Sequence, residues 1–510
     1  MAVELATKPT GTSLQQLAEQ SWQRLGPDAL LIFEGETHTS GELARRTRRL
    51  AQGLVTAGLQ PGDRVVLCMA NCPEVGIAYN AIWRAGGVTT PVLFLLSDDE
   101  LRHVLADSAA AFVVTTPDFL AKVQAAGAGL DTLRGVILAT GEAAGTLSYA
   151  ELESAEEGTL VERDPAEMAA LLYTGGTTGR SKGVMLSHDA MSAAAWAAVT
   201  RSHDPELNVA LTPLPLSHAY GLLVSTLGLH APEPSDSILM RWFDPAGWVE
   251  LAVKHRVTLG AVVPSMLQML LSLPLEEYDL SSLRRLTSGG APLLAETRAE
   301  LARRLPDVEV MEGYGMTETA ALISSSPPGA VRAGAVGIPV PGVELRLEKP
   351  DGTVAETGED GEICVRGPVL MTGYWRSPEA TAETIRDGWL HTGDVGRLDA
   401  DGYLYVVDRL KDLIIRGGIN VYPRDIEDAM LTHPDVVACG VVGKPDPTYG
   451  EEVVAFVQLR PGAAVDAAAL VEWARGHINK AKYPREVRIV DAIPLTSVFK
   501  TDRKAMRKLL

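Results

Sequence analysis

Apolar runs alternate with amphipathic segments early in the chain. Residues 64–69, 88–93 and 111–115 are short runs of mostly apolar side chains, whereas residues 74–86 and 98–106 carry apolar side chains at helical spacing. Strands that are apolar at nearly every position are buried on both faces, and strands separated by helices pair in parallel. This stretch therefore predicts a parallel sheet covered by helices.

A second alternation of the same kind lies in the middle of the chain. Residues 259–263, 283–288 and 308–312 have the composition of buried strands, and residues 266–273 and 293–305 have that of helices. Two of these strands run directly into loops that contain glycine. The pattern predicts a second α/β layer with polar loops at the ends of its strands.

The pattern changes after residue 331. Short strands of alternating polarity, separated by turn residues such as Asp401-Gly402, predict a small antiparallel sheet. A charged stretch at residues 408–412 precedes a compact α+β unit. We expect an α/β fold with a large N-terminal domain, residues 1–409, of two α/β sheet subdomains plus a small β subdomain. A small α+β C-terminal domain, residues 410–510, follows it.

A loop of glycines and hydroxyls follows a further predicted strand at residues 168–173. Glycines let backbone N–H groups approach an anion, hydroxyls donate further hydrogen bonds, and lysine adds a positive charge. Ligands bind at the carboxyl ends of strands in open α/β sheets, so we interpret this loop as a polyphosphate site. Its candidate phosphate-binding residues are Thr174, Gly175, Gly176, Thr177, Thr178 and Lys182.

Two other interpretations of the loop exist. It does not match a Walker A loop, because Ser181 precedes Lys182 instead of following it. Residues 179–183 do match the G-x-S-x-G pattern of serine hydrolases, with Ser181 as the nucleophile. Ser181 lies several residues beyond the apolar run, whereas a nucleophile elbow follows its strand directly. A serine hydrolase stays as an alternative, and so does a loop that binds nothing.

Composition narrows the class of protein. The net charge of −19 argues against general binding of nucleic acid or anionic membranes, and no apolar run is long enough to cross a bilayer. Four cysteines form neither a zinc spacing nor a dense disulfide framework, and the first residues lack the apolar segment of a secretory signal. We expect a large cytoplasmic enzyme with no nucleic-acid partner and no integral membrane contact. The sequence indicates no oligomeric state.

Five motifs occur along the chain: the loop of residues 174–183, residues 314–318, residues 392–394, residues 408–412 and Lys500. With these motifs, nearly the whole chain resembles the adenylate-forming superfamily of acyl-CoA synthetases, peptide-synthetase adenylation domains and luciferases. The resemblance implies an acyl-CoA ligase. ATP and a carboxylic acid give an acyl-adenylate and pyrophosphate, and the thiol of coenzyme A then displaces AMP. The implied cofactors are ATP, Mg²⁺ and coenzyme A.

The resemblance also implies roles for residues in the first half-reaction. Lys182 and the rest of its loop would hold the β- and γ-phosphates, Thr317 would contact the α-phosphate, and Glu318 would bind Mg²⁺. Lys500 would bridge the carboxylate and the α-phosphate. The implied adenine, ribose and adenylate contacts are Tyr314, Asp394, Arg409, Gly290, Ala291 and Gly315.

Other roles concern the acyl and coenzyme A sides. His218 would gate the acyl pocket, and Lys411 would be the hinge of a mobile C-terminal domain. The remaining implied residues are Val263, Gly289 and Gly313 in the acyl pocket and Gly417 and Gly418 beside the coenzyme A arm. Structural alternatives stay open: Glu318 as a helix cap, Asp394 in a turn, Arg409 paired with Asp408, and His218 as an ordinary core histidine.

The sequence departs from the family pattern at several positions. Gly175 and Ser181 stand where the family has serine and proline, and Asp425 replaces a usual glutamate. Phe499 occupies a glycine position directly before Lys500. A bulky ring there is unfavourable in a tight turn, so one alternative is an enzyme with weakened adenylation that mainly thioesterifies a supplied acyl-adenylate. The other is that the ring packs without effect.

The carboxylic acid is not specified by the sequence. Small apolar residues at positions 220–229 and near Val263 suit an aliphatic, an aryl or a bulky polycyclic acid equally. Since no acidic anchor adjoins His218 or Val263, amino acids are disfavoured.

Overall fold

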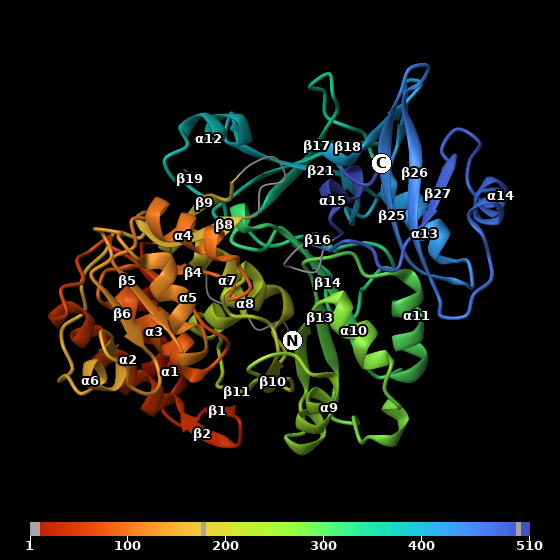
Figure 1. Ribbon diagram of the computed structural model, residues 1–510. Coiled ribbons are helices and arrows are strands. Elements are labelled where there is room, and N and C mark those ends of the chain that lie inside the picture. Colours follow the sequence, from red (N-terminus) through yellow and green to blue (C-terminus); the bar gives the residue numbers. More distant parts are fainter. Residues whose placement is uncertain (1–10, 175–179, 496–500) are drawn as a thin grey trace. The chain divides into compact units, whose positions relative to one another are not determined.

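The computed structural model describes residues 11–174, 180–495 and 501–510 (Figure 1). The chain forms two compact units. The first comprises Met1–Glu344 and Arg366–Leu390, and the second comprises Leu345–Val365 and His391–Leu510. Each unit is described by itself below. No helix among the described residues is both long and apolar enough to span a bilayer.

An eight-stranded sheet carries the early part of the first unit, in the order β19-β9-β8-β4-β3-β5-β6-β7 (Figure 1). Strands β3 to β8 pair in parallel, whereas β9 is antiparallel to both β8 and β19. The bounds are β3 Arg64–Cys68, β4 Val88–Pro91, β5 Phe112–Thr115, β6 Gly135–Leu138, β7 Leu147–Ser148, β8 Met168–Thr174, β9 Lys182–Ser187 and β19 Gly373–Tyr374.

Helices cover both faces of this sheet. In β3, consecutive residues Val65 and Val66 point to opposite faces, and both are fully buried. The covering helices start at clear signals: Pro73 at the first turn of α3 (Pro73–Arg84), and a capping box between Ser97 and Glu100 at α4 (Asp98–Asp107). The predicted parallel sheet with helical cover is confirmed.

A nine-stranded sheet forms the rest of the first unit, in the order β16-β15-β14-β13-β12-β10-β11-β1-β2. Its strands β1 and β10 to β14 run parallel, and β2, β15 and β16 pair antiparallel. The bounds are β1 Leu30–Phe33, β2 Glu36–Thr39, β10 Val209–Thr212, β11 Asp236–Leu239, β12 Leu259–Val262, β13 Arg285–Ser288, β14 Glu309–Tyr314, β15 Ser324–Ser325 and β16 Ile338–Pro339.

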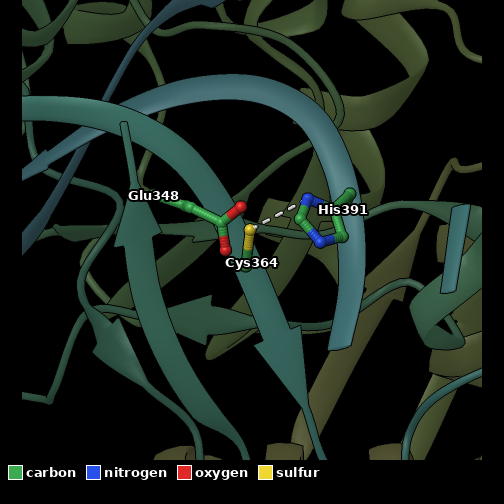
Figure 2. Close-up of side chains that lie close together, drawn as sticks. All are labelled: Glu348, Cys364 and His391. Carbon is green, nitrogen blue, oxygen red and sulfur yellow. Dashed lines mark hydrogen bonds between the residues drawn. The ribbon is translucent and has the colours of Figure 1, made fainter. Parts of the chain in front are cut away.

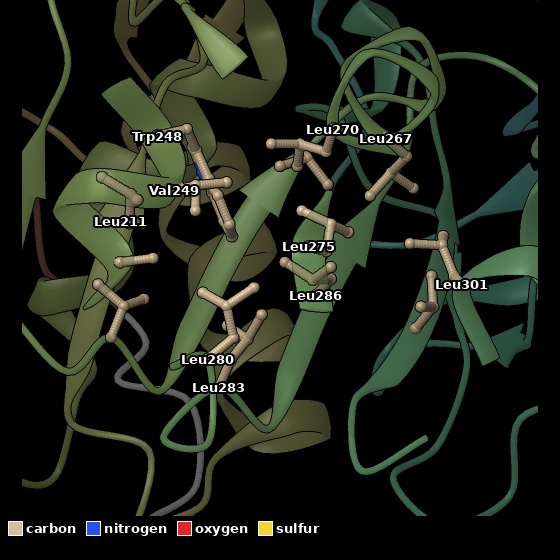
Figure 3. Packing of buried hydrophobic residues seen from close by; sticks show 14 of the residues in the cluster. Leu211, Trp248, Val249, Leu267, Leu270, Leu275, Leu280, Leu283, Leu286 and Leu301 are labelled. Carbon is tan, nitrogen blue, oxygen red and sulfur yellow. The ribbon is translucent and has the colours of Figure 1, made fainter. Parts of the chain in front are cut away.

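One apolar cluster packs helices onto this second sheet. Trp248 of α9 (Pro245–Lys254) and Leu267 of α10 (Pro264–Leu271) are buried against the side of the sheet that carries Leu286 of β13 (Figure 3). Leu301 extends the cluster from α11 (Ala295–Arg304). The second α/β alternation predicted from the sequence is therefore present.

Two further sheets contribute to the second unit. The first is antiparallel, with the order β17-β18-β21-β20 and β22 paired to β21, and its short strand β20 belongs to the first unit. The second has the order β24-β23-β26-β25, with antiparallel pairs except that β27 pairs in parallel with β26. The bounds are β17 Glu344–Glu348, β18 Asp360–Arg366, β20 Ile385–Arg386, β21 Trp389–Leu398, β22 Leu404–Arg409, β23 Ile414–Arg416, β24 Ile419–Val421, β25 Val436–Asp446, β26 Gly450–Leu459 and β27 Glu486–Ile489.

The second unit also contains helices α13 (Pro423–Leu431), α14 (Ala467–His477) and α15 (Arg503–Arg507). Ile426 and Met430 of α13 and Leu470 of α14 are fully buried in one cluster with residues of β25 and β26. The expected antiparallel β subdomain and α+β C-terminal region are both found, so the predicted fold class is confirmed.

The sequence pattern does not predict strand β9. The segment between the phosphate loop and helix α7 (His188–Ser202) pairs along β8 over six residues, from Thr174 opposite Lys182 to Met168 opposite Ser187. A six-residue segment that starts with a lysine and ends in a helix cap has little periodicity of its own. The tertiary pairing with β8 makes it a strand.

Candidate functional site

The predicted phosphate loop connects the two strands of an antiparallel hairpin. Thr174 ends β8 and Lys182 begins β9, and the two residues are register partners. Gly175, Gly176, Thr177 and Thr178 lie outside the described residues. The chain continues from the loop into a strand, whereas a nucleophile elbow needs a helix there. The carbonyl of Ser181 lies 3.0 Å from Nε2 of His103, and the local geometry does not favour the hydrolase interpretation.

Tyr374 lies next to both Lys182 and Glu318. The Lys182 ammonium lies over the Tyr374 ring at 5.1 Å from its centroid, a cation–π geometry. The Tyr374 hydroxyl donates a hydrogen bond of 2.8 Å to Oε1 of Glu318, whose side chain is almost fully buried. Burial and the Glu318 carboxylate raise the pKa of Tyr374, so the phenol stays a neutral donor. The fold thus brings a cation and a carboxylate to the same aromatic ring.

Residues 314–318 form the turn that leaves β14 and enters a short 3₁₀ segment, Thr317–Thr319. A Cβ on Gly315 would overlap the backbone carbonyl of Ala321, so only glycine fits at that position. Thr319 closes the turn, because its hydroxyl accepts from Met316 N at 3.2 Å and donates to Met316 O at 3.0 Å. Tyr314 and Thr317 are partly buried beside this turn.

The predicted acyl-pocket residues gather at the ends of neighbouring strands. A Cβ on Gly289, after β13, would lie 3.2 Å from the carbonyl of Gly313 on β14. Gly290 has a left-handed φ of +82°, and a Cβ there would lie 3.9 Å from Cγ1 of Val263. The exposed Ala291 follows Gly290. The structure therefore brings Val263, Gly289, Gly290 and Gly313 together.

Tyr220, the first residue of the stretch 220–229 that the sequence analysis associates with the acyl pocket, also belongs to this region. A Cβ on Gly289 would lie 3.7 Å from Cε1 of Tyr220. The Tyr220 hydroxyl donates to the carbonyl of Thr287 at 3.2 Å and lies 3.0 Å from its Oγ1. Burial raises the pKa of Tyr220 to about 12. Its partners are 67 residues away in sequence, so no local signal marks these contacts.

His218 caps a helix in this structure. It is the N-cap residue of α8 (Ala219–Thr226), and its Nδ1 accepts from the backbone N–H of Tyr220 at 3.3 Å. This contact orients the ring at the start of α8. His218 is only partly buried, so its structural contact is that of a helix cap and not that of a core residue.

Asp394 and Arg409 form a pair in the second unit. They are register partners on β21 and β22, and Arg409 Nε lies 3.0 Å from Asp394 Oδ1. The Asp394 carboxylate is buried, whereas the Arg409 side chain is about half exposed at 47%. Asp408 instead accepts from two backbone N–H groups, those of Arg409 and Arg424. The predicted partnership of Asp394 and Arg409 is present.

The predicted hinge and tunnel residues lie just beyond this pair. Lys411 sits in a single 3₁₀ turn, Leu410–Asp412, and partial desolvation followed by the charge of Arg409 lowers its pKa. Gly417 and Gly418, both with positive φ, make the turn between β23 and β24. Phe499 and Lys500 lie outside the described residues.

A cluster of polar side chains, two of them buried, includes His391, three residues before Asp394. Glu348, Cys364 and His391, from β17, β18 and β21, offer ligand-type atoms within 4.8 Å of one another, and Figure 2 shows them turned toward a common point. His391 Nδ1 lies 3.3 Å from Cys364 Sγ and 2.9 Å from Oε2 of Glu362. These contacts account for the arrangement as a hydrogen-bonded cluster. It is the one group of metal-ligand type found among the described residues.

Sequence reasoning missed Glu362, His391 and Tyr374. His391 directly precedes the Thr392-Gly393-Asp394 motif, and this position was an available signal. Glu362 and Tyr374 contact their partners across 29 and 56 residues, so nothing in their local sequence marks them.

Two largely parallel sheets with glycine turns, a lysine and a buried carboxylate at their strand ends have the architecture of an enzyme for phosphorylated ligands. Residues 18–375 match the family model of the AMP-binding enzyme, and residues 425–500 match that of the AMP-binding enzyme C-terminal domain. The chain belongs to this family of adenylate-forming enzymes.

Relatives over nearly the full length support the assignment. A feruloyl-CoA synthase of Amycolatopsis sp. is 39% identical over 95% of this chain and 96% of its own. The 4-coumarate–CoA ligase 5 of Oryza sativa is 36% identical over 93% and 90%. The ATP-bound structure of MatB from Rhodopseudomonas palustris matches 98% of this chain and 99% of its own, with a TM-score of 0.90 and 34% identity.

The protein is an ATP-dependent acyl-CoA ligase. It activates a carboxylic acid as an acyl-adenylate and transfers the acyl group to coenzyme A. This confirms the function implied by the five motifs. The serine hydrolase and the enzyme restricted to thioesterification are not favoured.

Proposed function

We propose that the carboxylic acid is an aromatic propenoic acid of the hydroxycinnamate class. The proposal is carried by the 39% and 36% identity to relatives named for ferulate and 4-coumarate, over more than nine tenths of this chain. The strand ends are compatible with it, because the Tyr220 ring lies close to Gly289 and offers an aromatic surface for a flat acid.

In the first half-reaction, the described residues act mainly by positioning and by neutralising charge. Lys182, with Thr174 and the glycines and threonines of its loop, would hold the β- and γ-phosphates. Thr317 would contact the α-phosphate. Tyr314 would stack on adenine, and Gly290, Ala291 and Gly315 would let the backbone approach the adenylate. In the second unit, Asp394 would accept the ribose hydroxyls, held in orientation by Arg409.

Glu318 suits a Mg²⁺ ion. Mg²⁺ prefers oxygen ligands, and the buried Glu318 carboxylate supplies them. The bound ion would supply positive charge to the phosphates. Tyr374 holds one oxygen of Glu318 through its hydroxyl, which fixes the rotamer of the carboxylate. The chain's own contribution there is a preoriented, largely water-excluded carboxylate.

In the second half-reaction, we propose that residues 410–510 act as a mobile domain that turns about Lys411 relative to residues 1–409. Gly417 and Gly418 would then line the channel for the coenzyme A arm, because absent side chains leave room for a thin chain. His218 would gate the acyl pocket, and Lys500 would bridge the carboxylate and the α-phosphate. The enzyme uses ATP and coenzyme A, and its four cysteines are free thiols, so a cytoplasmic location suits it.

The substrate proposal is tested by CoA-dependent AMP release from a panel of acids. We expect ferulate and 4-coumarate to give kcat/KM at least about tenfold above those of dodecanoate, hexadecanoate and malonate. A preference for any of the latter three would contradict the substrate class. Because an amide bond synthetase from Marinactinospora thermotolerans is a structural neighbour at 33% identity, amines are tested as acceptors too. Faster acyl transfer to an amine than to coenzyme A would contradict the proposed acceptor.

A further inference from the structure

The residues just before Asp394 on β21 are held by the side chain of Glu362, within the second unit. Glu362 of β18 uses both carboxylate oxygens on residues of β21. Its Oε2 lies 2.9 Å from His391 Nδ1, and its Oε1 accepts from the backbone N–H of Gly393 at 3.1 Å. Glu362 therefore holds the residue immediately before Asp394 and the residue three positions before it.

The segment between these two contacts is unusual for a strand. Gly393 has a φ of +70°, a left-handed conformation that L side chains rarely adopt. Thr392 between them donates its hydroxyl to the carbonyl of Ile363 at 2.8 Å, and the same hydroxyl accepts from Asp394 N at 3.1 Å. These side-chain contacts therefore add to the strand pairing of β21 in fixing the backbone that leads into Asp394.

Burial makes these contacts consequential. The His391 side chain is 5% exposed and that of Glu362 is 16% exposed. Cys364, completely buried, adds its thiol at 3.3 Å from the same Nδ1, and Glu348 closes the group (Figure 2). Hydrogen bonds to a charged group in such surroundings contribute more than exposed ones do. His391 Nδ1 contacts both Glu362 and Cys364, so the group forms a hydrogen-bonded support within the sheet.

We propose that Glu362 is a positioning residue for Asp394: by bracing His391 and Gly393, it aims the Asp394 carboxylate at the ribose hydroxyls of ATP. This inference rests on the ribose-binding role proposed for Asp394. Arg409 holds the same carboxylate from the other side through Asp394 Oδ1. Recognition of the ribose then depends on a residue that does not itself touch the nucleotide.

The test measures nucleotide discrimination in the full-length enzyme, with kcat/KM for ATP divided by kcat/KM for 2′-deoxy-ATP. Asp394→Asn is expected to abolish the preference for ATP. Glu362→Ala is expected to reduce it at least about fivefold, mainly through a higher KM for ATP, because a misdirected acceptor loses contact with the 2′-hydroxyl. Glu362→Gln keeps an acceptor oxygen for Gly393 N–H and should retain most of the preference.

Two further variants complete the design. Glu362→Asp keeps the charge, but its side chain is shorter by one methylene and cannot reach both His391 and Gly393. It should therefore lower the preference for ATP over 2′-deoxy-ATP. This variant also provides a test if the alanine variant does not fold. Asp360→Asn is the matched control on the same strand, because that carboxylate pairs with Arg397 at the surface, and it should behave as wild type.

The outcomes separate the two proposals. If Asp394→Asn loses the preference but Glu362→Ala and Glu362→Asp retain it, Glu362 is purely structural and the inference is overturned, even when thermal stability falls. If Asp394→Asn also retains the preference, Asp394 does not bind the ribose, and its proposed role fails together with the inference.

Discussion

Tyr374 shows how one residue can connect two charged groups that the sequence keeps far apart. Its ring lies beneath the Lys182 ammonium, and its hydroxyl holds Glu318. A change to phenylalanine removes the hydrogen bond to Glu318 but keeps the ring next to Lys182, so it tests the hydrogen bond alone.

We expect Tyr374→Phe to lower the rate of acyl-AMP formation about tenfold and to raise the Mg²⁺ concentration needed for half-maximal rate. The reason is that Glu318 loses the donor that fixes its rotamer. Pyrophosphate release over a Mg²⁺ titration measures both effects. Tyr405→Phe is the control, since Tyr405 donates to Asp399 in the second unit. Equal Mg²⁺ dependence in the two variants would contradict the role assigned to Tyr374.

Gly315 is the position where the backbone itself excludes a side chain. We expect Gly315→Ala to reduce activity at least about a hundredfold, because the Cβ displaces the backbone of Ala321 and the turn that carries Thr317. Gly76→Ala, on helix α3, where a Cβ meets nothing within 4 Å, is the matched control and should stay within about twofold of wild type. Steady-state kinetics and thermal unfolding check both variants. An active Gly315→Ala enzyme would show that the turn can relax.

At the scale of elements, the position of Lys182 at the end of the loop of residues 174–183 depends on the strand that follows. Because β9 returns alongside β8, Lys182 lies at the same end of the sheet as Thr174.

Helix α13 is also held by residues outside it. Asp408 accepts a hydrogen bond from the backbone N–H of Arg424 at the N-terminus of the helix, and Glu427 lies on its buried face.

Glu427 gives the second unit a pH-dependent stability. Burial raises the pKa of this carboxyl to about 7, while Arg503, at 2.7 Å, acts in the opposite direction. A carboxyl with a raised folded-state pKa binds its proton more tightly in the folded state. Its stabilising contribution is therefore complete below the unfolded pKa of about 4.3 and is lost as the pH rises through about 7.

We expect the free energy of local unfolding around α13 and β25 to fall by about 2 kcal/mol between pH 5 and pH 7.5 in wild type. Glu427→Gln should remove most of this dependence. Hydrogen exchange of α13 and β25 amides, compared between wild type and variant at each pH, measures it. Glu472→Gln, on the exposed face of α14, should leave the dependence intact. A wild-type profile flat across this range would contradict the raised pKa.

At the scale of the whole molecule, the late Lys500 is expected to serve chemistry organised around a loop about 300 residues earlier. The chain belongs to a family of acyl-CoA ligases in which one enzyme performs both half-reactions. We therefore expect adenylation to proceed with Phe499 in place. Pyrophosphate exchange should fall at least about a hundredfold in Lys500→Ala and stay within about twofold of wild type in Phe499→Gly. An exchange rate in Phe499→Gly more than tenfold above wild type would show that Phe499 impairs the lysine.

The features that could be predicted from the sequence are those that depend on residues close together in the chain. The parallel strands, their covering helices, the later antiparallel sheets and the order of the five motifs could all be inferred, because each depends on periodicity or turn chemistry within a few residues. Strand β9 was missed because its conformation depends on pairing with β8. Of the candidate site, the pair of Asp394 and Arg409 and the grouping of Val263, Gly289, Gly290 and Gly313 were anticipated.

The sequence by itself determined the class of fold, the family and the chemistry, since glycines, hydroxyls, a lysine and carboxylates in that order already specify phosphate binding and acyl activation. Only the tertiary structure decided which side chains support them. The position of Tyr374 between Lys182 and Glu318 depends on the order and register of strands far apart in the chain. The same is true of the contact between Glu362 and the residue before Asp394. Side-chain convergence across a sheet is set by packing and strand pairing, and no local pattern of residues encodes it.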